Sequence, residues 1–271
     1  MRHTSHLGTS SAVVVTGAAG GIGSATVRRL ARDGHKVVCC DIDATGLKTL
    51  VASVEREGGV AVAEVGDVTV PTDCERFVAR AADLGVPLKG LVNNAAVGAF
   101  HLTVETTSLE DWQRIIAVNL TSIFLVSRAA IPRIRAAGGG AIVNVSSIHA
   151  YATSTGVAPY AAAKGGVLAL TRTMALDLAP DYIRVICLIP GAVDTPMLRS
   201  HAERERKSLA ELGFPAGDAE IGRIAAPEEL AGAIAFLLSR DATFITGSAL
   251  VWMAESSRSS RAKQNPPLSW M

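Results

Sequence analysis

Short apolar runs rich in β-branched residues recur along the chain and alternate with longer segments whose apolar residues repeat at helical spacing. The apolar runs predict strands at residues 12–16, 36–40, 60–65, 90–92, 141–145, 183–189 and 248–252. The longer segments predict helices at residues 24–33, 47–57, 73–84, 109–136, 160–178 and 227–238. Parallel neighbours in a sheet need crossover connections of this kind. The pattern therefore predicts an α/β fold, a doubly wound parallel sheet of about seven strands with helices on both faces.

The length of 271 residues fits one large domain, which we expect over residues 12–254. Apolar residues make up 49% of the chain and aromatic residues only 4%, a composition suited to parallel strands covered by helices. The net charge of +1 provides no long-range field that would attract nucleic acid or an anionic membrane surface. Charge or glycine interrupts every apolar run before the ~18 residues that a membrane span requires, so we expect no transmembrane helix. A small-molecule partner is favoured.

Three segments fall outside the alternation. Residues 1–11 are small and polar, and we expect a flexible start without a secretory signal. Residues 190–226 form an unusually long connection, which is typical of a lid over a binding site, and the expected lid spans about residues 197–222. Residues 255–271 are rich in Ser, Arg and Lys, and this composition predicts a disordered tail.

The four cysteines, Cys39, Cys40, Cys74 and Cys187, have neither metal-ligand spacing nor the density of a disulfide scaffold. We therefore expect buried free thiols and no bound metal. Free thiols indicate a reducing compartment, and the expected localisation is cytoplasmic.

A glycine-rich turn follows the first predicted strand and opens the first predicted helix. Its candidate cofactor-binding residues are Gly17, Gly20, Gly21, Ile22 and Gly23. Glycines allow a tight turn and let the backbone approach a pyrophosphate, which the N–H groups and the positive end of the helix then hold. An ordinary strand-to-helix turn can carry the same pattern, so the assignment depends on the surrounding residues.

Asp41 ends the second predicted strand, and Ile42 follows it. A carboxylate at this place can accept both ribose hydroxyls of NAD and repel the 2′-phosphate of NADP. Neither the glycine turn nor the position after Asp41 holds a Lys or Arg that would compensate a phosphate. We therefore predict NAD as the cofactor. The alternative role for Asp41, capping the next helix, is less favoured because Asp43 is better placed for it.

Two further strand ends carry candidate cofactor residues. Asp67 and Val68 end the third strand and can contact the adenine, although Asp67 is equally compatible with an ordinary turn or cap. After the fourth strand, the small residue Ala95 beside Asn94 permits close passage of a cofactor. The alternative is a structural pair, Asn93 and Asn94, that holds adjacent strands, and we expect one of the two to do this.

The candidate catalytic group is formed by Tyr160, Lys164 and Ser147. Tyr160 and Lys164 are four residues apart, so they share one face of a predicted helix. A phenol becomes a useful base at neutral pH when its pKa falls by ~3 units, which takes about 4 kcal/mol of phenolate stabilisation, and the Lys164 ammonium can supply much of this. Ser147 can then hydrogen-bond the substrate oxygen while Tyr160 exchanges a proton with it.

Together these motifs resemble the short-chain dehydrogenase/reductase family in its short, single-domain form. The residues that carry the resemblance are Thr16-Gly17 to Gly23, Asp67, Asn93-Asn94-Ala95, Asn119, Ser147, Tyr160, Lys164 and Pro190-Gly191 through Thr195. The resemblance covers about residues 11–252, and the order and spacing of the motifs make it specific. It implies a Rossmann-type fold and a hydride transfer between a nicotinamide and a secondary alcohol or ketone.

The resemblance also implies roles for individual residues. Asn119 would organise a water-linked proton relay, and Lys164 would hold the nicotinamide ribose besides tuning Tyr160. Pro190 and Gly191 would lead into a segment that carries the backbone groups of Val193 and the hydroxyl of Thr195 toward the nicotinamide amide. The segment beyond, from about residue 197, would cover the substrate.

Some positions depart from the family's pattern. Tyr182 and Ile186 stand where the family often has Gly and Asn, which leaves the packing of the sixth strand open. The sequence Val251-Trp252-Met253-Ala254 replaces the usual Val-Asp-Gly-Gly ending. Relatives often use this region in a tetramer interface, so the departure leaves the subunit packing open. The resemblance still implies a homo-oligomer, a tetramer or a dimer.

Three functions are compatible with these residues. An NAD-dependent alcohol dehydrogenase or ketone reductase accounts for every motif. A noncatalytic NAD-binding regulator on the same fold would not need the joint presence of Ser147, Tyr160, Lys164 and Asn119. An epimerase or dehydratase usually adds a substrate domain, for which too few residues remain. His149 is a candidate substrate contact or a loop histidine without a role. Sugars, polyols, cyclic diols, steroids and hydroxy acids all remain possible substrates.

Overall fold

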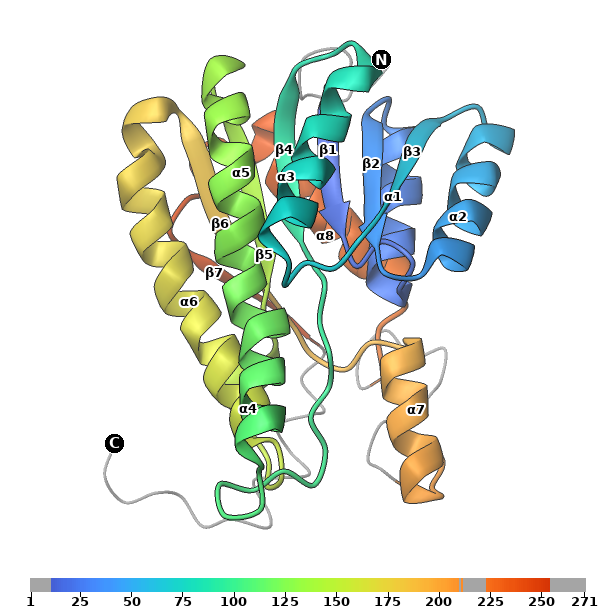
Figure 1. Cartoon of the computed structure of the whole chain (residues 1–271), viewed down its shortest axis with the longest axis vertical. Coiled ribbons are helices and arrows are strands. Elements are labelled where there is room, and N and C mark those ends of the chain that lie inside the picture. Colours follow the sequence, from blue (N-terminus) through green and yellow to red (C-terminus); the bar gives the residue numbers. More distant parts are fainter. Residues whose placement is uncertain (1–10, 210, 212–222, 254–271) are drawn as a thin grey trace.

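The computed structural model describes residues 11–209, 211 and 223–253, and within them seven parallel strands form a single sheet (Figure 1). The strands are β1 (Ala12–Thr16), β2 (Lys36–Asp41), β3 (Val60–Val65), β4 (Leu88–Asn93), β5 (Gly140–Val145), β6 (Ile183–Pro190) and β7 (Ala249–Trp252). Their order across the sheet is β3-β2-β1-β4-β5-β6-β7, and all pairings are parallel. The predicted doubly wound α/β fold is confirmed, and it is of Rossmann type.

Helices connect the strands. They are α1 (Gly21–Arg32), α2 (Ala44–Arg56), α3 (Pro71–Ala79), α4 (Leu109–Ile116), α5 (Ser122–Ala136), α6 (Ala158–Leu178), α7 (Pro196–Glu205) and α8 (Pro227–Leu238). Short 3₁₀ turns lie at Arg80–Leu84, Ile148–Ala150, Ala179–Asp181 and Arg240–Ala242. Figure 1 shows most of the helices flanking the sheet, whereas α7 extends away from it.

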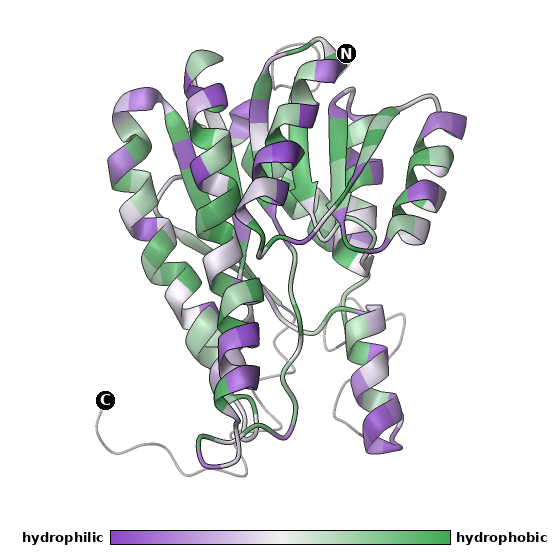
Figure 2. Cartoon of the chain, viewed as in Figure 1, coloured by the Kyte–Doolittle hydropathy of each residue, from purple (hydrophilic) through white to green (hydrophobic). Residues whose placement is uncertain are grey.

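The core forms two layers, one on each face of the sheet. Alternate residues of a strand point to opposite faces. In β1, Val13 and Val15 pack with the buried sides of α1, α2 and α8, whereas Ala12 and Val14 pack with those of α3, α5 and α6. Figure 2 shows the same arrangement as predominantly hydrophobic strands, in contrast to the hydrophilic far end of α7.

The strand order reverses between β1 and β4. From β1 the chain moves outward to β2 and β3, and from β4 it moves in the opposite direction to β5, β6 and β7. The loops that leave β1 and β4 therefore diverge and open a crevice beyond the carboxyl ends of the strands, where ligands bind in folds of this type.

The first part of the expected lid is helical. Helix α7 begins with Pro196 at its first position, and the side chain of Thr195 accepts a hydrogen bond from the N–H of Leu198 (3.4 Å). Thr followed by Pro is a helix start that the sequence analysis missed, because the charged residues that follow give no apolar stripe. Residues 1–10, the lid residues 210 and 212–222, and the expected tail at 255–271 lie outside the described residues.

The helix expected at residues 109–136 is divided into α4 and α5 by a π-helical turn, Ala117–Thr121. By length and composition alone this segment is long and apolar enough to cross a membrane, with a mean hydropathy of 1.7 over its most apolar 18-residue window. In the structure 39% of its most apolar window is buried, and Val126, Ala130 and Ile134 belong to the core beneath the sheet. Core helices pass the same test of length and composition, and these contacts are those of a core helix.

The two unusual residues around β6 are both accommodated. Tyr182 adopts a left-handed backbone conformation (φ 57°), the conformation for which glycine is favoured, and its side chain is exposed. Ile186 is fully buried in the layer beneath α8. The strand therefore pairs regularly with β5 and β7 despite both departures.

Candidate active site

A cavity of about 710 Å³ is lined by residues that follow the carboxyl ends of β1 to β6. The predicted site residues that line it are Gly17, Gly20, Gly21, Ile22, Asp41, Ile42, Asp67, Val68, Asn94, Ala95, Ser147, His149, Tyr160, Lys164, Pro190, Gly191, Val193 and Thr195. Gly23 and Asn119 do not line it and lie behind its wall. The fold thus brings residues from distant parts of the sequence to one place.

The glycine turn is folded back on itself at Gly23. A Cβ atom at this position would lie 2.0 Å from the carbonyl oxygen of Gly17, so only glycine fits. Gly20 precedes α1 and provides no side-chain cap for the first N–H groups of the helix. Uncapped N–H groups beside a cradle without side chains fit the pyrophosphate of a dinucleotide.

Asp41 ties the end of β2 to the glycine turn. Its Oδ2 accepts from the N–H of Ala19 (2.9 Å), and its Oδ1 accepts from the N–H of Asp43 (3.1 Å). Asp43 caps α2, as expected, because its Oδ1 accepts from the N–H groups of Thr45 and Gly46 (3.1 and 3.0 Å). Asp41 also lines the cavity, whereas its two carboxylate oxygens each accept one backbone hydrogen bond.

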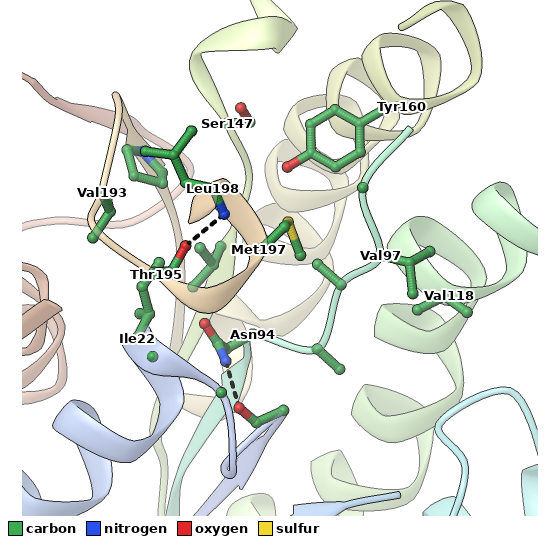
Figure 3. A pocket seen from close by; sticks show the side chains of 18 of the residues that line it. Ile22, Asn94, Val97, Val118, Ser147, Tyr160, Val193, Thr195, Met197 and Leu198 are labelled. Carbon is green, nitrogen blue, oxygen red and sulfur yellow. Dashed lines mark hydrogen bonds between the residues drawn. The ribbon is translucent and has the colours of Figure 1, made fainter. Parts of the chain in front are cut away.

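The two asparagines after β4 have different roles. Asn93 is buried, and its Nδ2 donates to Asn144 Oδ1 (2.8 Å) on the neighbouring strand β5. Asn94 Nδ2 donates to the carbonyl oxygens of Thr16 and Gly17 (3.0 and 3.1 Å) and so fixes the glycine turn (Figure 3). Asn93 is therefore the structural member of the pair.

Asp67 lines the cavity but also forms a local turn. Its Oδ1 accepts from the N–H and the hydroxyl of Thr69, each at 2.8 Å. Asp67 thus forms the ordinary turn that the sequence also allowed. The neighbouring Val68 is buried and lines the cavity.

The three candidate catalytic side chains meet where β5 ends beside α6. Ser147 follows β5, whereas Tyr160 and Lys164 lie one turn apart on α6, with Lys164 Nζ 5.6 Å from the centre of the Tyr160 ring. Lys164 is buried, and its Nζ donates to the carbonyl oxygen of Val145 (3.0 Å), the last residue of β5. In Figure 3 the phenol of Tyr160 points into the cavity on the side where Ser147 and Met197 lie. This arrangement places a proton donor and a hydroxyl partner beside the dinucleotide cradle.

The family model described as enoyl-(acyl carrier protein) reductase matches residues 17–252 of the chain. The chain belongs to the short-chain dehydrogenase/reductase (SDR) family.

Curated relatives and solved structures agree with this assignment. The human dehydrogenase/reductase SDR family member 4 is 37% identical over 241 residues, which cover 88% of this chain and 84% of the relative. The cyclohexanol dehydrogenase of Acinetobacter sp. (strain SE19) is 37% identical over 238 residues, 88% of this chain and 91% of the relative. A 3-ketoacyl-(acyl-carrier-protein) reductase from Brucella melitensis, solved with NADH, superposes with a TM-score of 0.81 at 33% identity, covering 91% and 98% of the two chains.

Burial shifts the pKa values of Lys164 and Tyr160, the candidate catalytic pair of this SDR. Burial lowers the pKa of Lys164 to about 8, although the Cys187 thiol behind it acts in the opposite direction. Burial also raises the pKa of Tyr160, and a hydrogen bond with Ser147 only partly opposes the shift. The expected lowering of the Tyr160 pKa by Lys164 is not observed, and the net shift is upward. The reason is that the low-dielectric surroundings disfavour both the phenolate and the ammonium.

Asn119 lies in the π-helical turn between α4 and α5 and is fully buried. Its Nδ2 donates to the carbonyl oxygens of Ile115 and Val97, each at 3.0 Å, and so holds the loop after β4 against the helix. Its Oδ1 is buried and has no hydrogen-bond partner among the residues the structure describes. A buried acceptor of this kind is a place where an ordered water binds.

His149 lies beside Tyr160. Its ring meets that of Tyr160 edge to face, with 5.8 Å between the centres and 81° between the planes. His149 Nδ1 is also 3.4 Å from the hydroxyl of Thr153. The imidazole therefore lies in the cavity wall next to Tyr160. A residue that contacts the substrate would have to lie there.

The apolar side chains on the substrate side of the cavity were predicted only in part. Met197 and Leu198 on α7 belong to the segment expected to cover the substrate, whereas Val97 and Phe100 from the loop after β4 and Val118 from the π-helical turn were not predicted. Figure 3 shows Val97, Val118, Met197 and Leu198 around the cavity. These side chains are apolar and belong to segments without a regular hydrophobic period. Their nearness to the glycine turn and to Tyr160 depends on tertiary folding.

The four cysteines are buried free thiols, and each is in the part of the chain that the structure describes. Among the described residues, no group of three or more His, Cys, Asp or Glu side chains is arranged to hold a metal ion.

Proposed function

We propose that this SDR is an NAD-dependent oxidoreductase that transfers a hydride between the nicotinamide and a secondary alcohol or its ketone. The observation that carries the proposal is the meeting of Tyr160, Lys164 and Ser147 at one cavity whose other end is the glycine turn. A noncatalytic NAD-binding regulator would not require this set of side chains.

Each side chain has a distinct part in the proposed reaction. The bound nicotinamide supplies the hydride acceptor or donor. Tyr160 exchanges a proton with the substrate oxygen, and Ser147 hydrogen-bonds the same oxygen and orients the reacting carbon. Lys164, fixed by the Val145 carbonyl, holds a ribose hydroxyl and favours the phenolate when it is charged. Asn119, with its unpaired buried oxygen, supports a water that links Lys164 to solvent.

NAD is the proposed cofactor because of the charges at the ribose end. Asp41 presents a carboxylate to the cavity, and Lys164 is the only Lys or Arg among the described residues that line it. A 2′-phosphate near Asp41 would meet negative charge without compensation. The relative solved with NADH is consistent with this choice.

A neutral, compact alcohol is the proposed substrate. The described residues that line the cavity around Val97, Phe100 and Met197 have uncharged side chains, so they offer no partner for a carboxylate or phosphate on the substrate. The cyclohexanol dehydrogenase relative acts, by its name, on an alcohol of this kind.

The test is a panel of secondary alcohols incubated with NAD, with NADH absorbance as the readout. Turnover of cyclic or short secondary alcohols supports the proposal. Absence of turnover across the panel and the matching ketones, together with intact NADH binding, would instead favour the noncatalytic regulator.

We also propose that the protein is a homo-oligomer. Phe124 on α5, Leu176 on α6 and Phe236 on α8 are exposed apolar residues on long helices. Light scattering coupled to size-exclusion chromatography gives the mass, and a monomer at micromolar concentration would contradict this proposal.

A further inference from the structure

Helix α7 and the loop after β4 are joined by an aromatic stack. The rings of Phe100 and His201 are nearly parallel, with 8° between their planes and 4.2 Å between their centres. Burial lowers the pKa of His201, and its Nδ1 is buried with no hydrogen-bond partner within the described ranges. The imidazole is therefore neutral near pH 7 and packs on Phe100 as a flat apolar surface.

A second contact lies one helical turn further along α7. His101 Nε2 is 2.6 Å from Glu205 Oε1, and residues 201 and 205 share one face of the helix. His101 also has a left-handed backbone conformation (φ 58°), which a residue with a side chain keeps only where its surroundings hold it. Two adjacent residues of the loop thus contact two successive turns of α7.

The same loop is fixed to the catalytic helix on its other side. The N–H of Leu102 donates to the carbonyl oxygen of Gly156 (2.8 Å), and the N–H of Ala158 donates back to Leu102 (3.0 Å). Ala158 is the first residue of α6, which carries Tyr160. The position of Phe100 is therefore determined relative to the reacting group.

Phe100 lines the substrate side of the cavity, whereas His201 lies behind it and does not. A Cβ atom at Gly98 would lie 2.7 Å from the Phe100 ring and 3.7 Å from Met197 Cγ, so glycine makes the room that the ring occupies. Met197 and Tyr160 line the same cavity, and both side chains are drawn in Figure 3. The ring of Phe100 thus packs at Gly98 and Met197 in the wall of the same cavity that Tyr160 lines.

We infer that Phe100, held by its stack on His201, closes the substrate end of the cavity and restricts this SDR to compact substrates. In this inference Phe100 is the specificity-determining residue that touches the substrate, and His201 is a positioning residue that acts through it. The inference rests on the proposed function, because it concerns the alcohol that Tyr160 and Ser147 bind.

The test compares cyclohexanol with 4-tert-butylcyclohexanol, and 2-butanol with 2-decanol, as substrates with NAD. Each pair shares the reacting group and differs in length. Phe100→Ala is expected to raise the long-to-short ratio of kcat/KM by about tenfold or more, because a pocket that gains room for several methylene groups loses its discrimination. The change should appear mainly in KM for the long substrate.

Two further variants separate positioning from general damage. His201→Ala should raise the same ratio to a smaller extent, and His201→Phe, which keeps an aromatic ring for the stack, should return it to the wild-type value. Phe244→Ala is the matched control, because it removes the same side chain from a fully exposed position. NADH binding, followed by fluorescence, shows that each variant is folded.

The outcomes distinguish the inference from the function on which it rests. If the wild-type protein converts none of these alcohols nor the corresponding ketones, the proposed function fails and the inference falls with it. If the wild type is active and Phe100→Ala keeps its long-to-short ratio while NADH binding persists, only the inference is overturned.

Discussion

The carboxylate of Asp41 accepts a hydrogen bond from the backbone N–H of Ala19, with 2.9 Å between Oδ2 and N. This bond joins the end of β2 to the glycine turn after β1. One side chain therefore both shapes the turn and places negative charge at the ribose end of the cavity. Variants that remove the charge but keep a hydrogen-bond acceptor can separate the two effects.

Asp41→Asn is expected to narrow the preference for NAD over NADP by roughly 10- to 100-fold, because juxtaposed like charges cost several kcal/mol and each 1.4 kcal/mol is a factor of ten. The asparagine Oδ1 can still accept from Ala19, so the turn should keep its shape, although the amide nitrogen cannot replace the oxygen that accepts from the N–H of Asp43. The ratio of kcat/KM for the two cofactors measures the effect. Asp41→Ser, which is too short to reach Ala19, should narrow the ratio as well but weaken NAD binding further. A wild-type preference for NADP would refute the assignment of Asp41.

Tyr160→Phe removes the only hydroxyl that we assign to proton exchange, and it is expected to lower kcat by about 10²- to 10⁴-fold. The ring remains, so its contact with His149 and the affinity for NADH should persist. Steady-state kinetics and NADH fluorescence together measure the two properties. Tyr182→Phe removes the same hydroxyl from an exposed tyrosine and serves as the control. Retention of full turnover by the Tyr160 variant would contradict the mechanism.

The site residues at the ends of strands could be predicted from the sequence, because the loops after parallel strands meet at one edge of the sheet. Asp41, Asn94 and Ser147 each follow a β-branched run, so their common location followed from the alternation of strands and helices. Tyr160 and Lys164 share a helix face by spacing alone. Local patterns and one rule of topology were therefore enough to predict where these residues lie.

The rest of the site could not be predicted in this way. Phe100 and His201 have no local pattern that relates them, and their stack depends on how the loop after β4 meets α7. The pKa shifts of Tyr160 and Lys164 depend on burial, which residue spacing does not reveal. The π-helical turn at Asn119 interrupts a segment whose hydrophobic period suggests one continuous helix.

The raised pKa of Tyr160 gives the two directions of the reaction different pH profiles. Alcohol oxidation requires the phenolate, which is the minor form below the raised pKa of Tyr160. The value of kcat/KM for oxidation should therefore rise by about tenfold per pH unit between about pH 7 and 9. Ketone reduction uses the phenol, the major form, and should be nearly constant over the same range. A flat oxidation profile would contradict the role of Tyr160 as the base.

We predict that the affinity for the cofactor depends on pH through the charge of Lys164. Its pKa is lowered to about 8, so the ammonium is present below that pH and is lost above it. The affinity for NADH, measured by fluorescence, should decline above about pH 8 in the wild-type protein. In Lys164→Ala the affinity should be lower throughout and should lack this decline. If Lys164→Ala binds NADH with the same affinity and the same pH dependence as the wild type, Lys164 does not bind the ribose.

Gly23 and Gly165 provide a matched pair of substitutions in two helices. A Cβ atom at Gly23 would lie 2.0 Å from the Gly17 carbonyl oxygen, so Gly23→Ala must displace the turn. We expect at least a tenfold loss of NADH affinity, or about 1.4 kcal/mol, and a lower midpoint of urea unfolding. Gly165 lies on α6 with no atom within 4 Å of its added Cβ, so Gly165→Ala should stabilise the helix by roughly 0.5–1 kcal/mol. Equal effects of the two substitutions on NADH binding would contradict the close packing of the glycine turn.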